Sequence, residues 1–337
     1  MELLTHTDVR DKTRHSTIPA FRLVDSQLGQ VKKLIREQLT APSKTEGVGR
    51  LLDYVSTHSG KMLRPALVLL AGAACGRIGT EHIRVAAVIE MIHNATLLHD
   101  DVIDEGKSRR GAATVNSLWG NESAILLGDS LLSRVFKMCA TLEPCIARVI
   151  AAAAFRVCEG ELRQVSQRHN WQLSESEYID IITEKSAALF SCCCYLGGLL
   201  ARASESEARS LADFGLNAGI AFQITDDLLD IIGDENQTGK TPGSDAGKNK
   251  LTLPVIHLLK TIDERGKSEI IEKLNANRYT LNANFMEMLG SYGSLEYTRK
   301  RAREFADRAV KALDGLEKSD AKDALIEAAK FMADRTI

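Results

Sequence analysis

Two short acidic segments contain the residues of this chain whose types and spacing best suit chemistry. The first, LLHDDVID, contains Asp100, Asp101 and Asp104. The pattern recurs in FQITDDLLD, with Asp226, Asp227 and Asp230. Carboxylates three and four residues apart share a helix face and destabilise the helix unless a positive charge lies between them. A single copy could be an exposed turn of helix, but two copies inside apolar helices indicate a functional site.

The ligand chemistry of these segments points to a hard cation. Oxygen donors without neighbouring His or Cys are typical of such ions. Carboxylates that supply only part of the coordination shell suit Mg²⁺, which keeps waters and takes its other ligands from substrate phosphates. The aspartates lie on predicted helices rather than in a calcium-binding loop, so we exclude an EF-hand.

Basic side chains occur at spacings that could bring them to the same site. They are Lys61, Arg64, His93, Arg109, Arg110, Lys185, Lys240 and Lys250. His93 precedes Asp100 by seven residues, two helical turns, and therefore faces the same side. Each cation alone could be a surface charge. An anion with several phosphate oxygens would account for many of them together, because Arg binds phosphate through two bonds and Lys as a point charge.

The elements that position these residues are predicted to be helices. The six prolines leave the intervals 66–143, 145–241 and 255–337 free of proline, and these are rich in good helix formers. Aromatic residues are only 5% of the chain, and alternating strand patterns are lacking. We therefore expect an all-α fold with helices at about 24–39, 48–57, 64–74, 81–104, 122–140, 145–167, 176–203, 205–233, 252–261, 267–274, 294–313 and 321–335.

The organisation predicted along the chain is a flexible N-terminal arm over residues 1–20 and one large helical domain over 21–337. The longest expected loop, Gly233 to Lys250, is polar and charged. A long loop in a compact domain is often functional.

Composition excludes several classes of function. The net charge is −2, so no global basic field favours nucleic acid. The longest strongly apolar stretch, Ala66 to Cys75, is too short to span a bilayer, and the N-terminus has no signal-peptide core. The seven cysteines show no CxxC pair, which is typical of reduced thiols. We therefore expect a cytoplasmic protein without a transmembrane segment.

Five segments, in order along the chain, resemble the trans-isoprenyl (polyprenyl) diphosphate synthase family, and most closely its long-chain octaprenyl, heptaprenyl and solanesyl members. They are GKMLRP (60–65), HDDVIDEGKSRRG (99–111), GELRQ (160–164), KSAALF (185–190) and FQITDDLLDIIGDENQTGKTPGSD (222–245). The resemblance extends from about Gly60 to Pro254. Five ordered elements are far more specific than one aspartate motif.

This resemblance implies a helical bundle around a deep central cavity, usually a homodimer. The reaction would join isopentenyl diphosphate head-to-tail to an allylic diphosphate. It would require Mg²⁺, with three ions when substrate is bound, and the released pyrophosphate would take the proton. No catalytic base is then needed from the protein.

The resemblance also implies a role for each matching residue. The metal ligands would be Asp100, Asp104 and Asp226, supported by Asp101, Asp227 and Asp230. Isopentenyl diphosphate would be held by Lys61, Arg64, His93 and Arg110. The allylic diphosphate would be held by Arg109, Lys185, Ser186, Gln223, Lys240 and Lys250. Two positions depart from the family pattern: Ser186 replaces a frequent Thr, and Asn249 replaces a frequent Gly.

Product length is predicted from the residues before the first motif. In the resembling family, aromatic side chains four and five positions before the first aspartate shorten the product. Here these positions are Thr96 and Ala95, and the apolar wall continues through Met91 and Val88. Phe136 and Met138 are the candidates for the cavity floor. We expect a long-chain product of about six to ten isoprene units (about C30–C50).

Other functions stay open at this point. One alternative is a farnesyl or geranylgeranyl diphosphate synthase, with a shorter product. Another is a non-catalytic regulatory subunit of a heteromeric synthase, although such subunits usually lack one aspartate motif or the basic residues. A terpene cyclase would share the first motif but typically has a different second one.

Overall fold

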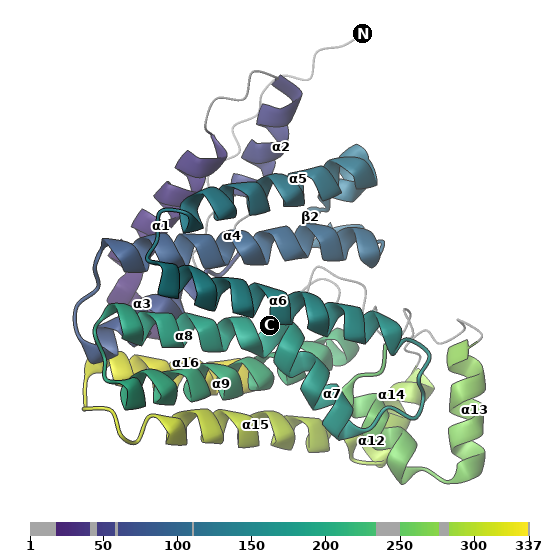
Figure 1. Ribbon diagram of the computed structural model, residues 1–337. Coiled ribbons are helices and arrows are strands. Elements are labelled where there is room, and N and C mark those ends of the chain that lie inside the picture. The colour runs from purple at the N-terminus through teal and green to yellow at the C-terminus, as the bar shows by residue number, and fades with distance from the viewer. Residues whose placement is uncertain are drawn as a thin grey trace.

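The computed structural model describes residues 18–40, 46–57, 60–109, 111–233, 250–275 and 283–335, with Glu46 and Ala283 described only in their backbone. Over this part of the chain the fold is almost entirely helical, which confirms the predicted all-α class (Figure 1). The N-terminal helices are η1 (Pro19–Val24), α1 (Asp25–Leu39), α2 (Glu46–Thr57), α3 (Leu63–Cys75), α4 (Thr80–Ile103), α5 (Val115–Cys139) and α6 (Pro144–Ser166). The later ones are α7 (Glu175–Ile182), η2 (Thr183–Ala187), α8 (Ala188–Leu200), α9 (Glu205–Ile232), α12 (Leu253–Thr261), α13 (Glu264–Asn275), α14 (Ala283–Ser291), α15 (Ser294–Ala312) and α16 (Asp320–Asp334).

Helix α9, which carries the second aspartate motif, runs between α8 and α15 (Figure 1). Helix α4, which carries the first motif, packs against α5 and also contacts α3 and α8. Helix α16 packs against α15, α9 and α3. One apolar cluster joins the N-terminal helices with α8, and a second surrounds α7, α12 and part of α9. Apolar packing therefore holds both motif helices on shared neighbours.

Local sequence signals explain where several helices begin. Ser174 and Ser204 each accept a hydrogen bond from the backbone N–H three residues on, and a glutamate at that position closes the capping box. Pro144 occupies the first position of α6, where its missing N–H costs nothing. These caps fix the helices that frame the candidate site.

The predicted continuous helix over 176–203 is wrong in one respect. The structure divides it into α7, a π-helical turn η2 at Thr183–Ala187, and α8. π-turns inside helices are rare and frequent at functional sites. This turn contains Lys185. Propensity could not reveal it, because the cause is tertiary: α6 approaches the backbone of the turn at Gly160, where a Cβ atom would lie 2.2 Å from the Lys185 backbone nitrogen.

Other boundaries also differ from the sequence prediction. Helix α5 begins at Val115 rather than 122, with a non-helical Gly120 at φ 84°. A two-residue antiparallel pair, β1 (Ser108–Arg109) and β2 (Ala112–Ala113), was not expected, and neither was α14. Ile18 and Ala20 are buried, although both belong to residues 1–20, the range predicted as a flexible arm.

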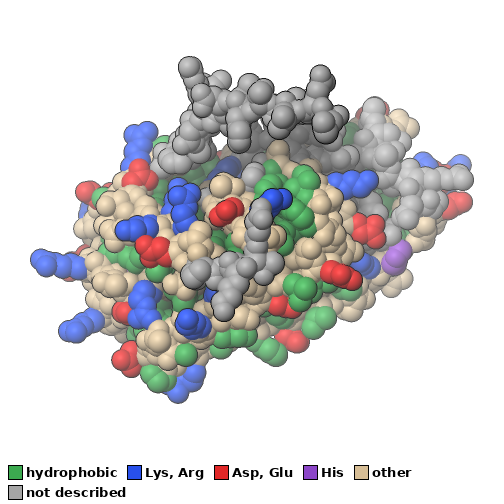
Figure 2. All heavy atoms as spheres, turned by 90° about the horizontal axis from the view of Figure 1, so that it is seen from above, with side chains coloured by type: hydrophobic (Ala, Val, Ile, Leu, Met, Phe, Trp, Pro, Cys, Tyr) green, Lys and Arg blue, Asp and Glu red, His purple; other side chains and the backbone are tan. Residues whose placement is uncertain are grey.

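The surface mixes charges of both signs. On the face seen from above, Lys and Arg side chains alternate with Asp and Glu, with hydrophobic side chains between them (Figure 2). This mixture agrees with a net charge of −2 for the whole chain. Within the described residues, we find no helix whose length and apolar character would let it cross a bilayer.

The contact between Gly160 and the π-turn predicts a sharp effect of one methyl group. Gly160→Ala should force α6 away from Lys185, because the nearest atoms are backbone and cannot rotate aside. Overpacking of this kind costs about 1–3 kcal/mol. We expect a lower melting temperature and at least about a tenfold loss of turnover. Gly29→Ala on α1 is the matched control, since nothing lies within 4 Å of its Cβ position. Equal melting temperatures for the two variants would contradict this account.

Candidate active site

The first aspartate motif lies at the carboxyl end of α4. Asp100 and Asp101 are in its last turn, and Asp104 is the residue that caps it. Three carboxylates at the negative end of a helix dipole are unfavourable unless cations neutralise them. Lys250 supplies one such charge: its Nζ lies 2.8 and 3.0 Å from the two carboxylate oxygens of Asp104. Arg168 is a second cation at this carboxylate and donates to Asp104 Oδ1 at 3.3 Å.

A tight hairpin returns Arg109 to this helix end. Its Nε and Nη2 both lie 2.8 Å from Oδ1 of Asp101, which is buried. The β1–β2 pair forms the turn, and Asn116 Nδ2 donates to the carbonyls of Asp101 and Gly106 at 3.1 Å each. The polar segment after α4 therefore holds the guanidinium of Arg109 against the carboxylate of Asp101. The predicted site residue Arg110 lies outside the described residues.

The second motif is held mainly by neutral hydrogen bonds. Asp227 on α9 is buried and accepts from Tyr178 Oη at 2.6 Å and from Gln223 Nε2 at 2.7 Å. The carbonyl oxygen of Gln223 accepts in turn from Ser186 Oγ at 2.6 Å. Three predicted site residues thus form one connected network, with Tyr178 of α7 as an unpredicted member.

Asp226 and Asp230 lie beside this network on α9, and both are partly buried. Asp226 Oδ1 accepts from Arg335 Nη2 at 2.7 Å. Arg335 follows the last residue of α16, a helix far from α9 in the sequence. The second motif is therefore reached by a charge that sequence spacing did not reveal.

Lys185, in the π-turn, reaches back to α6. Its Nζ pairs with Glu161 and donates to Gln164 Oε1 at 2.8 Å. Both partners belong to the segment GELRQ. On the outer side of the same turn, Arg156 binds Glu184 through two bonds of 2.6 and 2.9 Å. Lys185 is therefore fixed from α6 as well as from its own helix.

The residues predicted to hold isopentenyl diphosphate differ in their burial. Arg64, in the first turn of α3, is buried with its guanidinium carbon 4.5 Å from the ring centroid of Phe190. Lys61 is exposed, and His93 on α4 is partly buried. Lys240 lies outside the described residues. The joint role of these cations stays a prediction.

Arg109 connects the two motifs electrostatically. Burial disfavours its charged form, but the hydrogen bond to Asp101 and the charges of Asp101, Asp100 and Asp226 outweigh burial and raise its pKa. The charge of Arg109 is therefore stabilised mainly by the first motif, and the charge of Asp226 in the second motif adds to this effect.

The environment of Asp100 disfavours its negative charge. Burial raises the pKa of its carboxyl to about 6; Lys185 and Arg109 oppose this shift, and Glu161 and Asp104 add to it. A bound cation would relieve this cost. The donors available are hard carboxylate oxygens, which suit Mg²⁺. Across the described ranges, however, no three His, Cys, Asp or Glu side chains stand close enough together to hold a metal by themselves. The residues fit an ion that draws most of its ligands from water and a bound anion.

The predicted chain-length residues have different fates. Ala95, Met91 and Val88 are fully buried on α4, and Thr96 is partly buried with its hydroxyl donating to the carbonyl of His93 at 2.8 Å. Phe136 is wrong as a floor residue, because it is 69% exposed. Helix α5 turns Leu131, Val135 and Met138 toward the core. Phe136 follows Val135 and so points about 100° away, to the outside.

Comparison with known proteins identifies the family of this chain. A family model described as "Polyprenyl synthetase" matches residues 45–289. The chain belongs to this family. It is 36% identical to the octaprenyl diphosphate synthase of Escherichia coli (strain K12) over 316 residues, 93% of this chain and 97% of that one. It is 32% identical to a geranylgeranyl pyrophosphate synthase of Geoglobus acetivorans, over 91% of this chain and 95% of that one.

A solved structure agrees with these relatives. The polyprenyl synthase of Caulobacter crescentus, complexed with calcium and isoprenyl diphosphate, superposes with a TM-score of 0.89 at 32% identity. The match covers 95% of this chain and 98% of that one. The protein is thus a prenyltransferase of the all-α isoprenyl synthase fold, as the sequence predicted.

The raised pKa of Asp100 predicts a pH-dependent stability. Its folded pKa of about 6 exceeds the ordinary value of 3.8, so this carboxylate lowers the stability of the metal-free protein as pH rises from about 4 to 6. Asp100→Asn should therefore raise the melting temperature at pH 7.5 by a few degrees. At pH 4.5 the gain should shrink, because the wild-type group is then largely protonated. Thermal unfolding with a chelator present measures both. A gain of equal size at both pH values would disprove the assigned cause.

Proposed function

We propose that this prenyltransferase joins isopentenyl diphosphate head-to-tail to an allylic diphosphate, with Mg²⁺ as cofactor. The observation that carries the proposal is the set of cations bound to the two aspartate motifs: Arg109 on Asp101, Lys250 on Asp104 and Arg335 on Asp226. The Caulobacter structure supports it, because calcium and isoprenyl diphosphate are bound to a protein of the same fold. Two carboxylate-rich motifs with cations beside them suit a diphosphate anion that would bind together with metal ions.

The roles of the residues follow from this arrangement. Mg²⁺ held by Asp100, Asp104 and Asp226, as three ions when substrate is bound, supplies Lewis-acid activation of the allylic diphosphate as a leaving group. Asp101, Asp227 and Asp230 support these ligands. Fixed positive charge where the leaving group develops comes from Arg109, Lys185, Lys240 and Lys250. Isopentenyl diphosphate is bound by Lys61, Arg64, His93 and Arg110, which orient its double bond toward the allylic carbon.

Three of these cations bind carboxylates of the protein in the structure. Arg109 pairs with Asp101, Lys250 with Asp104, and Lys185 with Glu161. A bound metal ion would add positive charge beside the carboxylate of each pair, and a bound diphosphate would add negative charge beside the cation. The network can therefore accept its ligands with little change in net charge, and Ser186 with Gln223 keeps the wall of α9 in place.

Removal of a metal ligand tests the proposal directly. Asp100→Ala and Asp226→Ala should each lower turnover by at least about a thousandfold at saturating Mg²⁺, while circular dichroism shows a native helical content. Asp307→Ala, on the exposed face of α15, is the control and should keep full activity. Near-normal turnover of isopentenyl diphosphate in either motif variant would refute the assignment. A wild-type chain that is inactive alone would favour the regulatory subunit.

The proposed product is long, about six to ten isoprene units. The relatives include both octaprenyl and geranylgeranyl synthases, so this part of the proposal depends on the chain's own residues. Ala95 is fully buried and has no aromatic neighbour at Thr96. The small side chain leaves α4 without a bulky block at that level. A farnesyl or geranylgeranyl product is the alternative.

A bulky side chain at Ala95 should therefore stop elongation early. Ala95→Phe is expected to shorten the product by several isoprene units, and Ala95→Leu by fewer, with metal-dependent ionisation retained because no carboxylate changes. Chromatography with mass spectrometry of products made with excess isopentenyl diphosphate measures the lengths. Wild-type products of only fifteen or twenty carbons would show that the long-chain proposal is wrong.

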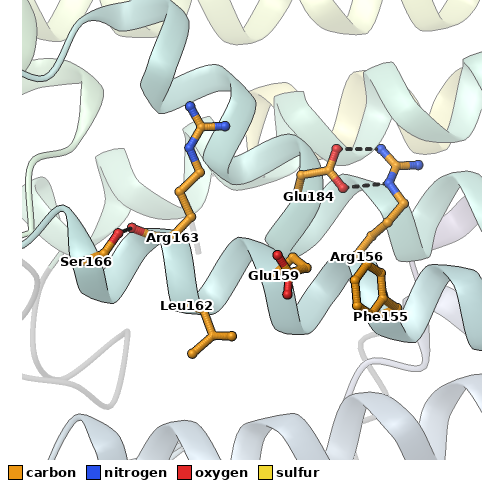
Figure 3. A pocket seen from close by; sticks show the side chains of 7 residues that line it. All are labelled: Phe155, Arg156, Glu159, Leu162, Arg163, Ser166 and Glu184. Atoms are coloured by element: carbon orange, nitrogen blue, oxygen red, sulfur yellow. Dashed lines mark hydrogen bonds and ion pairs between the residues drawn. The ribbon is translucent and has the colours of Figure 1, made fainter.

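We further propose that the enzyme is a homodimer, acting in the cytoplasm. Large apolar side chains are exposed along α5 and α6: Ile125, Leu126, Phe136, Phe155 and Leu162. Phe155 and Leu162 also line a surface pocket of about 560 Å³, together with the Arg156–Glu184 pair (Figure 3). Exposed apolar patches of this kind mark interaction surfaces, and a second copy of the same helices would be self-complementary.

A charge on this apolar stripe should weaken the dimer. Leu126→Glu is expected to shift the sedimentation velocity profile toward a monomer at micromolar concentration. Leu23→Glu, at an equally apolar exposed residue of η1 away from the stripe, should leave it unchanged. A monomeric wild-type protein would contradict the proposal, as would an unaltered dimer of the Leu126 variant.

A further inference from the structure

The residue after α16, Arg335, makes three separate contacts with α9. Its Nη2 donates to Asp226 Oδ1 at 2.7 Å and to the carbonyl of Phe222 at 3.2 Å. Its guanidinium carbon lies 3.9 Å from the centroid of the Phe222 ring. The side chain is only 9% exposed. A charged group this deeply buried needs partners, and all three belong to one turn of α9.

Two of these contacts do not involve Asp226 at all. The ring and the carbonyl of Phe222 fix the guanidinium in place whatever the carboxylate does. A guanidinium over an aromatic face is attracted by the negative face of the ring. Arg335 is therefore an anchored donor, rather than a mobile side chain that has paired with the nearest acid.

Phe222 lies between Arg335 and Phe190. Its ring centroid is 5.3 Å from that of Phe190, and the Arg64 guanidinium carbon is 4.5 Å from the Phe190 centroid. These contacts connect α3, α8, α9 and the end of α16. The pair of aromatic rings gives the anchor of Arg335 a rigid base.

Asp226 keeps 48% of its side chain exposed although one oxygen is bound to Arg335. The carboxylate is therefore orientated from the protein side and accessible from the other. In metal sites, a hydrogen bond from an outer residue to a ligating carboxylate fixes its orientation. The bond from Arg335 restricts the rotamers of Asp226, so the side chain loses less entropy when it binds an ion.

We propose that Arg335 is a positioning residue, which orients the carboxylate of Asp226 for the metal ion. This inference depends on the proposed function, since it requires Asp226 to be a metal ligand. The positive charge of Arg335 opposes the ion, but the charge is fixed and shared with the Phe222 carbonyl and ring. We infer that orientation outweighs repulsion, so that loss of Arg335 weakens metal binding.

The test measures metal binding without turnover. Full-length wild type and Arg335→Gln are titrated with Mg²⁺ in the presence of inorganic pyrophosphate, and the rise in melting temperature is followed. Removal of an outer partner typically costs about 10–100-fold in metal affinity, so the Mg²⁺ midpoint should rise about tenfold or more. The kcat at saturating Mg²⁺ should change much less. Arg335→Lys keeps the charge and should recover part of the affinity.

The matched control is Arg303→Gln. Arg303 Nε binds Asp334 Oδ1 at 2.9 Å, at the same end of α16, and both side chains of this ion pair are 55% exposed. Its loss should leave the Mg²⁺ midpoint unchanged. A purely structural role of Arg335 would lower the metal-free melting temperature without moving that midpoint.

The outcomes separate this inference from the proposed function. An unchanged midpoint in Arg335→Gln, with a wild type that responds to Mg²⁺, would overturn the positioning role alone. A lower midpoint would also overturn it, because the guanidinium would then compete with the metal. If Asp226→Ala still binds Mg²⁺ and turns over like wild type, the proposed function fails, and this inference fails with it.

Discussion

Carboxylates at the negative end of a helix, in a largely apolar surrounding, need positive charge, and most of this site meets that need. Asp101 and Asp104 lie at the end of α4, where the negative end of the helix dipole and their mutual repulsion are both unfavourable for two carboxylates. The hairpin after α4 places Arg109 against Asp101. Lys250, whose side chain is almost fully buried, pairs with Asp104. Each cation comes from a different element, so the motif is stable only in the assembled fold.

The second motif solves the same problem differently. Asp227 is buried and accepts from Tyr178 and Gln223, neutral donors that orient the carboxylate, while Arg335 supplies a positive charge to the neighbouring Asp226. The π-turn makes this possible, because it places Ser186 on Gln223 while Lys185 turns to α6. Gly160 lets α6 come close enough to hold that turn.

The sequence predicted much of this because its signals were local. The proline-free intervals indicated the helices, and the spacing of the aspartates within each motif placed the carboxylates correctly on α4 and α9. The contacts that were missed are tertiary. Tyr178 is an unremarkable residue of an apolar helix turn, and Arg335 has no motif around it, so only packing reveals their acceptors. Phe136 failed for a related reason: size suggested a core residue, but the face of α5 decides burial.

Asp100 shows what the arrangement leaves undone. Burial raises the pKa of Asp100 to about 6; Lys185 and Arg109 oppose this shift, and the neighbouring acids Glu161 and Asp104 add to it. A protein selected only for stability would remove such a charge, and active sites commonly retain one. Two positive charges act on the Asp100 carboxylate: Lys185, in the π-turn, and Arg109, in the hairpin. A divalent ion that binds with a diphosphate would add positive charge beside the carboxylate, while the two cations would meet the anion. The negative charge that burial makes costly is thus the same charge that would attract the ion.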